Sequence, residues 1–169
     1  MEIQIKDQEF TRLLKENKGI IYKVCNSYCA DKGDRDDLAQ EIIYNLWKSF
    51  DKFNTGFKFS TWMYRIALNV AISFYRQEKK YKNQKSISEE LIVFENGSEP
   101  KNETENNLTL LQHFISELKE IDKAIILLYL DDKSHREIAD ITGFTETNVA
   151  TKINRIKEKL KQNFQIIKN

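Results

Sequence analysis

The residues whose types and spacing suggest chemistry lie in the last quarter of the chain, and they are suited to hydrogen bonding. They are polar or basic side chains spaced so that a helix would place them on one face. The set is Thr147, Asn148, Thr151, Lys152 and Arg155. Asparagine can form two hydrogen bonds with the edge of adenine, whereas lysine and arginine bind phosphate well. We therefore expect this face to recognise nucleic acid.

A helix-turn-helix is the element that would position this face. Ser134 and Glu137 have the spacing of a capping box, in which each side chain bonds the other residue's backbone N–H. Gly143 stands where a tight turn requires a positive φ, and Thr145 can cap the second helix. The apolar residues of that helix recur at helical spacing: Val149, Ile153, Ile156 and Leu160. An ordinary helical hairpin is the alternative, but the capping box and the basic face together favour binding of duplex DNA.

Charge is strongly segregated along the chain, although the net charge is only +1. Residues 57–85 carry a charge of +6 and residues 133–169 carry +4, whereas residues 86–132 carry −8. A single basic segment is often no more than a solvated helix face. Two basic segments, each on a predicted helix, indicate two places that contact phosphate backbones.

The sequence offers no set of residues for catalysis, such as a glycine-rich phosphate loop or a metal-ligand cluster, so we do not expect an enzyme. Cys25 and Cys29 fall within an apolar pattern and are interpreted as small buried hydrophobes, because a zinc site would need two more ligands. We expect no metal, no cofactor and no small-molecule substrate. The chain has no apolar run of membrane-spanning length and no signal peptide, which predicts a cytoplasmic protein.

Helical periodicity predicts an all-α protein of two small domains. Residues 1–85 would form a three- to four-helix bundle, with helical patterns over 8–30 and 35–50, a break at Gly33, and a further helix capped by Ser60 or Thr61. Residues 86–107 are rich in Ser, Glu and Asn and are predicted to be a flexible acidic linker. Residues 108–169 would form a four-helix domain that contains the helix-turn-helix.

Both domains resemble bacterial sigma factors of the extracytoplasmic-function (ECF) group of the sigma-70 family. The N-terminal signature is DRDDLAQE at residues 34–41, then Leu46-Trp47, Phe50 and Phe53, and then FSTWMYRIALN at residues 59–69. This ordered set is similar to the family's second conserved region, and Ser134–Leu160 is similar to its fourth. The central third domain of larger sigma factors is absent, and the acidic segment stands in its place.

The resemblance implies a transcription initiation factor that binds core RNA polymerase and directs it to promoters. Four residues would contact the β′ clamp coiled coil of the polymerase: Asp37, Leu38, Gln40 and Glu41. The β flap would be a second polymerase contact. The resemblance implies an anti-sigma factor as a further partner, which is often membrane-anchored in this family.

The resemblance also assigns the two DNA contacts. The N-terminal domain would recognise the minus-ten element and open the strands, and the loop at residues 51–59 would capture a flipped base. Its candidate residues are Asn54, Phe57, Lys58, Trp62, Arg65, Asn69, Arg76, Lys79 and Lys80. The helix-turn-helix would read the minus-thirty-five element.

Two other kinds of non-catalytic protein remain as alternatives. A classical helix-turn-helix regulator would bind duplex DNA without being a polymerase subunit, usually as a dimer on paired half-sites. A helical adaptor would bind only proteins, and a titration with salt would leave its affinity for DNA unchanged.

Overall fold

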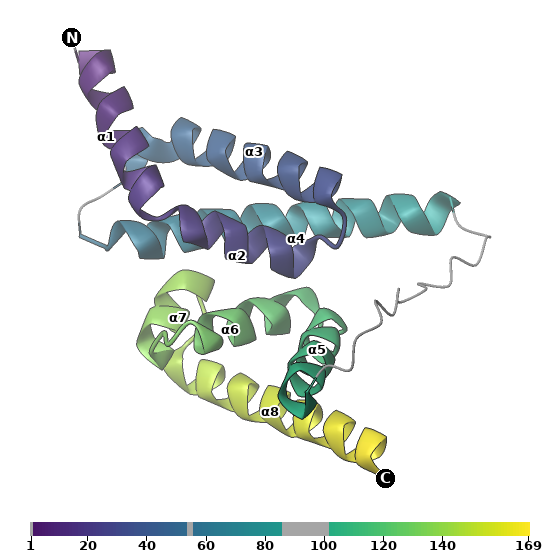
Figure 1. Ribbon diagram of the computed structural model, residues 1–169. Helices are drawn as coiled ribbons and strands as arrows, with labels where there is room; N and C mark the ends of the chain where they lie inside the picture. The colour runs from purple at the N-terminus through teal and green to yellow at the C-terminus, as the bar shows by residue number, and fades with distance from the viewer. Residues whose placement is uncertain (1, 54–55, 86–101) are drawn as a thin grey trace.

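The computed structural model describes residues 2–53, 56–85 and 102–169, and every regular element within them is helical. The described elements form two helical domains, one on each side of residues 86–101 (Figure 1). The prediction of an all-α protein with two domains is therefore confirmed. Most of the predicted linker, and the candidate residue Asn54, lie outside the described residues. Within the described residues, no helix is both long and apolar enough to cross a membrane.

The N-terminal domain is a bundle of four helices, within the predicted three to four. They are α1 (Glu2–Glu16), α2 (Lys18–Tyr28), α3 (Lys32–Ser49) and α4 (Phe59–Lys85), with a short 3-10 helix, η1 (Phe50–Lys52), after α3. The helices α2 and α3 both pack along α4 (Figure 1). The centre of the bundle is formed by fully buried side chains from α2, α3 and α4: Val24, Leu38, Ile42, Leu46, Met63, Ala67 and Ala71.

Three predicted boundaries in this domain were wrong. The pattern over 8–30 is two helices, which separate at Asn17, where the side-chain amide donates to the Leu13 carbonyl at 2.9 Å. Gly33 does not break the chain, because Asp31 caps α3 by accepting from the backbone N–H of Gly33. The helix α4 begins at Phe59, so Ser60 and Thr61 lie inside it and do not cap it.

The two cysteines are buried in the N-terminal domain, as the interpretation of small buried hydrophobes requires. Burial raises the pKa of the Cys25 thiol to about 11 and that of Cys29 to about 12. Because the thiolate is the reactive form of cysteine, a raised pKa leaves both side chains unreactive at neutral pH. Both residues therefore contribute to the core by packing.

The C-terminal domain contains four helices, as predicted: α5 (Glu103–Ser116), α6 (Glu120–Leu130), α7 (His135–Thr142) and α8 (Glu146–Lys168). The helix α5 begins at Glu103, within the range expected for the linker, because the Asn102 side chain caps it by accepting from the Glu105 N–H at 2.9 Å. The long helix α8 packs against each of the other three. Near the C-terminal end of α8, the Phe164 ring contacts the Phe114 ring of α5 edge-on, with 5.0 Å between the two ring centres.

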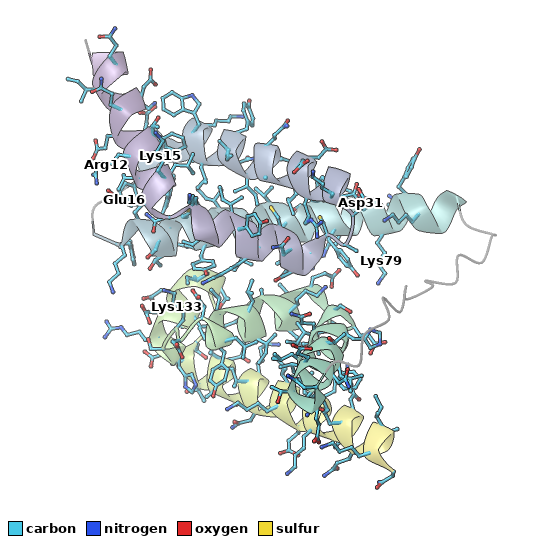
Figure 2. All side chains as sticks on the ribbon, viewed as in Figure 1. Arg12, Lys15, Glu16, Asp31, Lys79 and Lys133 are labelled. Carbon is cyan, nitrogen blue, oxygen red and sulfur yellow. The ribbon has the colours of Figure 1, made fainter. Side chains whose placement is uncertain are left out.

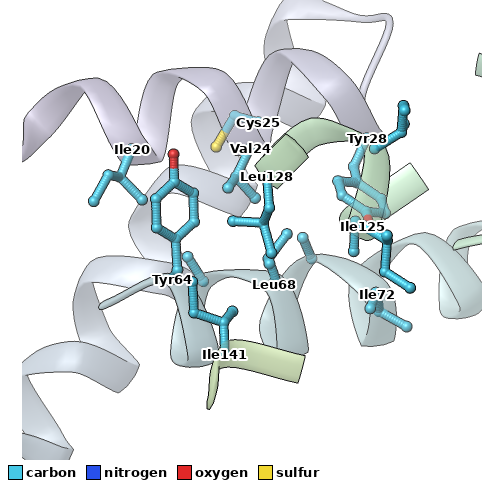
Figure 3. Close-up of a cluster of buried hydrophobic side chains, with 14 of the residues drawn as sticks. Ile20, Val24, Cys25, Tyr28, Tyr64, Leu68, Ile72, Ile125, Leu128 and Ile141 are labelled. Atoms are coloured by element: carbon cyan, nitrogen blue, oxygen red, sulfur yellow. The ribbon is translucent and has the colours of Figure 1, made fainter. Parts of the chain in front are cut away.

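The two domains are in direct contact through α4 of the first and α6 and α7 of the second. Figure 3 shows Leu128 and Ile141 of the C-terminal domain beside Tyr64 and Leu68 of α4, and these four side chains are buried. The apolar core therefore continues from one domain into the other.

Candidate nucleic-acid interface

The helix-turn-helix has the local geometry that the sequence predicts. Ser134 Oγ accepts from the Glu137 N–H at 3.2 Å, and Glu137 Oε2 accepts from the Ser134 N–H at 2.8 Å, which completes the capping box. Gly143 has a φ of 81° in the turn. Thr145 caps α8 by accepting from the Asn148 N–H at 3.2 Å. Each of these predicted roles is confirmed, and together they fix the angle at which α8 leaves α7.

Replacing Ser134 with alanine should lower the free energy of unfolding by about 0.5–2 kcal/mol, because the Glu137 N–H loses its acceptor. Hydrogen bonds from Ser134, the backbone N–H first, hold the pKa of Glu137 below its usual value. The charged form of Glu137 is therefore favoured by folding, so its contribution is present at neutral pH and is lost as the pH falls through that lowered pKa. Urea denaturation at pH 7 and pH 3 measures both effects.

Ser27→Ala is the matched control for the capping box, because the Ser27 hydroxyl donates to the Lys23 carbonyl within α2 and caps nothing. A loss of stability at pH 7 that was equal in the two variants would contradict the capping role of Ser134.

The polar face at the start of α8 is exposed, and the opposite face is buried. Thr147, Asn148, Thr151 and Arg155 are exposed, whereas Val149, Ile153 and Ile156 pack into the domain. Lys152 differs from the rest of the predicted set. It is half-buried, with its Nζ 3.8 Å from Asp122 Oδ1 and 5.2 Å from the centre of the Phe144 ring. Its charge is therefore already partly neutralised within the domain.

A second candidate site is a cavity of about 170 Å³ at the start of α4. Its lining residues are Lys52, Phe57, Thr61, Trp62 and Arg65. Three of these were predicted for strand capture, whereas Lys52 and Thr61 were missed. The position of Thr61 one helical turn before Arg65 is a signal that could have identified it. The cavity thus combines two aromatic rings with two cations.

The floor of this cavity is held in place by a cluster of aromatic rings. The Trp62 ring lies 5.2 Å from that of Phe53 and 5.3 Å from that of Phe59, between ring centres. Phe57 is 52% exposed and stands at the opening. The neighbouring Lys58 is exposed and does not line the cavity.

Beyond Trp62, the residues of α4 that were predicted to bind the minus-ten DNA continue from this cavity along the helix, and all but Asn69 are basic. Arg65, Asn69, Arg76, Lys79 and Lys80 are all exposed. Arg76 is paired with the C-terminal domain, with its Nε 3.5 Å from Glu120 Oε1. Lys79 extends from α4 beside the C-terminal domain (Figure 2). This basic face therefore borders the surface on which the two domains meet.

The predicted protein-binding face of α3 is exposed at three of its four residues. Asp37, Gln40 and Glu41 are exposed, whereas Leu38 is fully buried in the bundle and cannot contact a partner. Leu38 is therefore a core residue, and its inclusion among the contacts was wrong.

An apolar groove of about 430 Å³ adjoins this face of α3. It is lined by Asp7, Phe10, Thr11, Gln40, Ile43, Tyr44 and Trp47. The Tyr44 side chain is 61% exposed. Tyr44 was not among the residues predicted for this face. Its position, three residues after Glu41 and four after Gln40, places it on the same side of the helix.

Comparison with known proteins gives the same family for both domains. Residues 13–81 match the family model "Sigma-70 region 2", and residues 108–160 match "Sigma-70, region 4". The ECF RNA polymerase sigma factor SigW of Bacillus subtilis (strain 168) is 27% identical over 95% of this chain and 92% of its own. The ECF RNA polymerase sigma-E factor of Escherichia coli (strain K12) is 26% identical over 79% of this chain and 75% of its own.

Solved structures share the fold. The structure of CnrH in complex with the cytosolic domain of CnrY superposes with a TM-score of 0.68, at 19% identity, over 95% of this chain and 90% of that chain. The sigma factor RpoE from Bartonella quintana, in complex with the anti-sigma factor NepR, superposes with a TM-score of 0.62, at 18% identity, over 95% and 96% of the two chains.

Proposed function

The chain belongs to the ECF group of the sigma-70 family, and from this premise we propose which of its surfaces carries out each step of promoter recognition. It is a sigma factor of RNA polymerase, which recognises promoters through its region 2 and region 4 domains, and it is not an enzyme. The proposal concerns the individual residues, the polymerase subunits and the inhibitory partner.

The cavity at the start of α4 is proposed to capture a base that is flipped out of the minus-ten element. Phe57 and Trp62 would stack on the base, and Thr61 and Arg65 would donate hydrogen bonds to its edge. Lys52 at the rim would hold the adjoining phosphate. The observation that carries this proposal is that two aromatic rings and two cations line one open cavity. Asn54 and Lys58 are proposed to flank it.

The basic face of α4 would hold the same DNA strand after capture. Flipping a base costs a few kcal/mol of stacking and pairing, which must be offset by contacts made only with the open strand. Arg65, Asn69 and Lys80 are exposed and continue from the cavity along α4. Arg76 and Lys79 lie between Asn69 and Lys80 in this row.

The start of α8 is proposed to read the minus-thirty-five element in the major groove. Asn148 would form hydrogen bonds with adenine, because its side chain is exposed. The hydrogen bond from its backbone N–H to the Thr145 hydroxyl holds the residue in the first turn of α8. Thr147 and Thr151 flank it, and Arg155 would bind phosphate. Lys152 would exchange its ion pair with Asp122 for a phosphate contact.

Replacing Arg155 with alanine should weaken binding by a similar factor for every promoter sequence, because a phosphate contact carries no base preference. The slope of log affinity against log salt should become shallower by about 1. Fluorescence anisotropy of the polymerase–sigma complex on labelled duplexes, at several salt concentrations, measures both quantities. Asn148→Ala is the matched comparison, for which a change of preference at one base pair is expected. A change of sequence preference in Arg155→Ala would contradict the phosphate assignment.

The exposed face of α3 and its groove are proposed to dock on the β′ clamp coiled coil. Asp37, Gln40 and Glu41 supply polar contacts, and Ile43 and Tyr44 supply the apolar ones. An apolar patch surrounded by polar groups is typical of a protein–protein interface. The β flap would contact the C-terminal domain.

An anti-sigma factor is proposed as a further partner, because one superposed structure is of the sigma factor RpoE in complex with the anti-sigma factor NepR, and the other is of CnrH in complex with the cytosolic domain of CnrY. We propose that the protein acts in the cytoplasm, where its polymerase and DNA are found.

Transcription from a library of random DNA fragments tests the whole proposal. Core RNA polymerase of Bacillus subtilis is supplied with this protein, and the 5′ ends of the transcripts are sequenced. Starts that share sequences upstream, at both the minus-ten and minus-thirty-five positions, are expected only when the protein is present. Binding of duplex DNA by a dimer, without any dependence on polymerase, would instead identify a classical helix-turn-helix regulator.

A further inference from the structure

The short helix η1 contributes Lys52 to the cavity at the start of α4. It has three residues, and no side chain caps its N-terminal end. The hydrogen-bond geometry of a 3-10 helix is also poorer than that of an α-helix. The position of η1, and with it the position of Lys52, therefore depends on contacts with other elements.

The helix α1 supplies two of these contacts. In Figure 1, α1 lies beside the end of α3 from which η1 continues. Lys6 Nζ lies 2.7 Å from Asp51 Oδ1. The Phe10 ring meets the Phe50 ring edge-on, with 5.2 Å between the ring centres. Two of the three η1 residues thus contact α1, and the third, Lys52, lines the cavity.

The Lys6 side chain is itself fixed by a second contact. It is half-buried, and its Nζ lies 4.7 Å from the centre of the Trp47 ring of α3. A cation over an aromatic ring is attracted by the negative face of that ring. Ion pairs at the surface usually contribute little, because holding two long side chains in one geometry costs entropy. The contact with Trp47 reduces this cost, so Lys6 can hold Asp51 in a defined position.

From η1 the contacts continue to the floor of the cavity. The Phe50 ring is stacked with the Phe53 ring, with 6.2 Å between their centres, and lies 6.3 Å from the Trp62 ring. The backbone N–H of Phe53 donates to the Phe50 carbonyl at 3.0 Å. A displacement of η1 would therefore move two lining residues of the cavity, Lys52 directly and Trp62 through the rings.

We propose that Lys6 is a positioning residue for base capture, which holds η1 and therefore Lys52 in place through its ion pair with Asp51. The inference rests on the proposed function of the cavity. Lys6 lies outside the cavity, and it precedes the residues matched by the "Sigma-70 region 2" model, which begin at residue 13. Flipping a base costs stacking and pairing energy. A cavity that is already in shape offsets more of this cost than one that must be ordered during capture.

Exchanging the charges of Lys6 and Asp51 tests this role. Lys6→Asp and Asp51→Lys each place like charges together, and each should reduce the formation of open promoter complexes about fivefold. The double variant restores opposite charges and should regain most of the wild-type activity. Permanganate reactivity of unpaired thymines, on a promoter selected in the transcription experiment, measures opening. The two single variants change the net charge in opposite directions, so a simple effect of charge on DNA binding would lower opening in one and raise it in the other.

Arg12→Asp is the matched control. Arg12 makes an ion pair with Glu16 within α1, at 2.9 Å, and its replacement changes the charge of the same helix by the same amount. This control should open promoters as the wild type does. Phe10 is a poorer probe than Lys6, because it also lines the groove proposed for the polymerase.

A promoter whose minus-ten element is already unpaired by mismatches separates positioning from a general defect. Base capture is not needed to open that DNA, so run-off transcription by core polymerase should be the same with Lys6→Asp as with the wild type. A loss of folding or of polymerase binding would instead lower transcription from both templates, and an equal loss on both would overturn the positioning role.

Unchanged opening by Lys6→Asp, increased opening by Asp51→Lys, or a double variant as defective as the single ones would also overturn it. If a charge reversal prevents folding, Lys6→Met keeps the length of the side chain and removes only the charge. It should show a smaller loss of opening, and no loss would contradict the proposal. Phe57→Ala identifies failure of the proposed function. If that variant opens promoters as the wild type does, base capture itself fails, whereas a defect in Phe57→Ala without one in Lys6→Asp refutes only the role of Lys6.

Discussion

Replacing Tyr44 with alanine is expected to weaken the binding of core RNA polymerase by about 30-fold, or about 2 kcal/mol. A tyrosine at the centre of an apolar interface is one of the residues whose removal lowers the binding free energy most. The Tyr44 side chain is 61% exposed and lines the groove between α1 and α3, next to Gln40. Because it packs little within the free protein, its loss should change the free energy of unfolding by less than about 0.5 kcal/mol.

Titration of labelled protein with core polymerase measures this loss directly. Tyr22→Ala is the matched control, since the Tyr22 side chain is 74% exposed on α2 and lies outside the proposed polymerase and DNA surfaces. The control should bind as the wild type does. Equal affinities of the Tyr44 variant and the control would place the polymerase contact elsewhere, and the groove would then need another occupant.

Replacing Phe57 with alanine should reduce the formation of open promoter complexes by about 5- to 150-fold. Stacking of a base on an aromatic side chain contributes about 1–3 kcal/mol, and that contribution is realised only after the base has left the duplex. Phe57 is 52% exposed at the opening of the cavity, so its loss should leave the fold intact. Trp62 is a poorer probe, because it also packs against Phe53 and Phe59.

Permanganate reactivity of unpaired thymines measures opening on a promoter selected in the transcription experiment. Phe57→Tyr keeps the aromatic ring and should retain most of the activity. Binding of the duplex minus-thirty-five element should be the same in both variants. If Phe57→Ala opened promoters as well as Phe57→Tyr does, the cavity would not be the site of base capture.

The helix-turn-helix was the part of the molecule most completely predicted by the sequence, because its determinants are local. Ser134 and Glu137 are three residues apart and bond each other's backbone, so their geometry follows from the start of one helix. Gly143 and Thr145 likewise act on the turn and on the next helix start. Periodicity of apolar residues then indicates which face of α8 is buried.

The surfaces of the N-terminal domain were only partly predicted, because exposure depends on how helices pack. Leu38 falls within the signature of α3 but points into the bundle, whereas Tyr44 lies outside that signature and points out of it. The cavity proposed to capture a base forms only because the folded chain brings Lys52 of η1 next to Thr61 and Arg65 of α4. The signature predicted which segments of the N-terminal domain carry these surfaces, whereas the packing of the helices determines which of their side chains are exposed.

The sequence by itself determined the helical class, the two domains and the helix-turn-helix, since these depend on periodicity and on contacts a few residues apart. Only the tertiary structure decided that the domains close on each other. Lys23 and Asp131 are 108 positions apart, and Tyr28 and Glu120 are 92 apart. Such pairs form only when the surfaces of the two domains meet. The periodicity of residues in one segment does not predict which residues of the other segment it will contact. The contact between the domains is therefore a property of the folded chain, and it is made by residues that no local motif distinguishes.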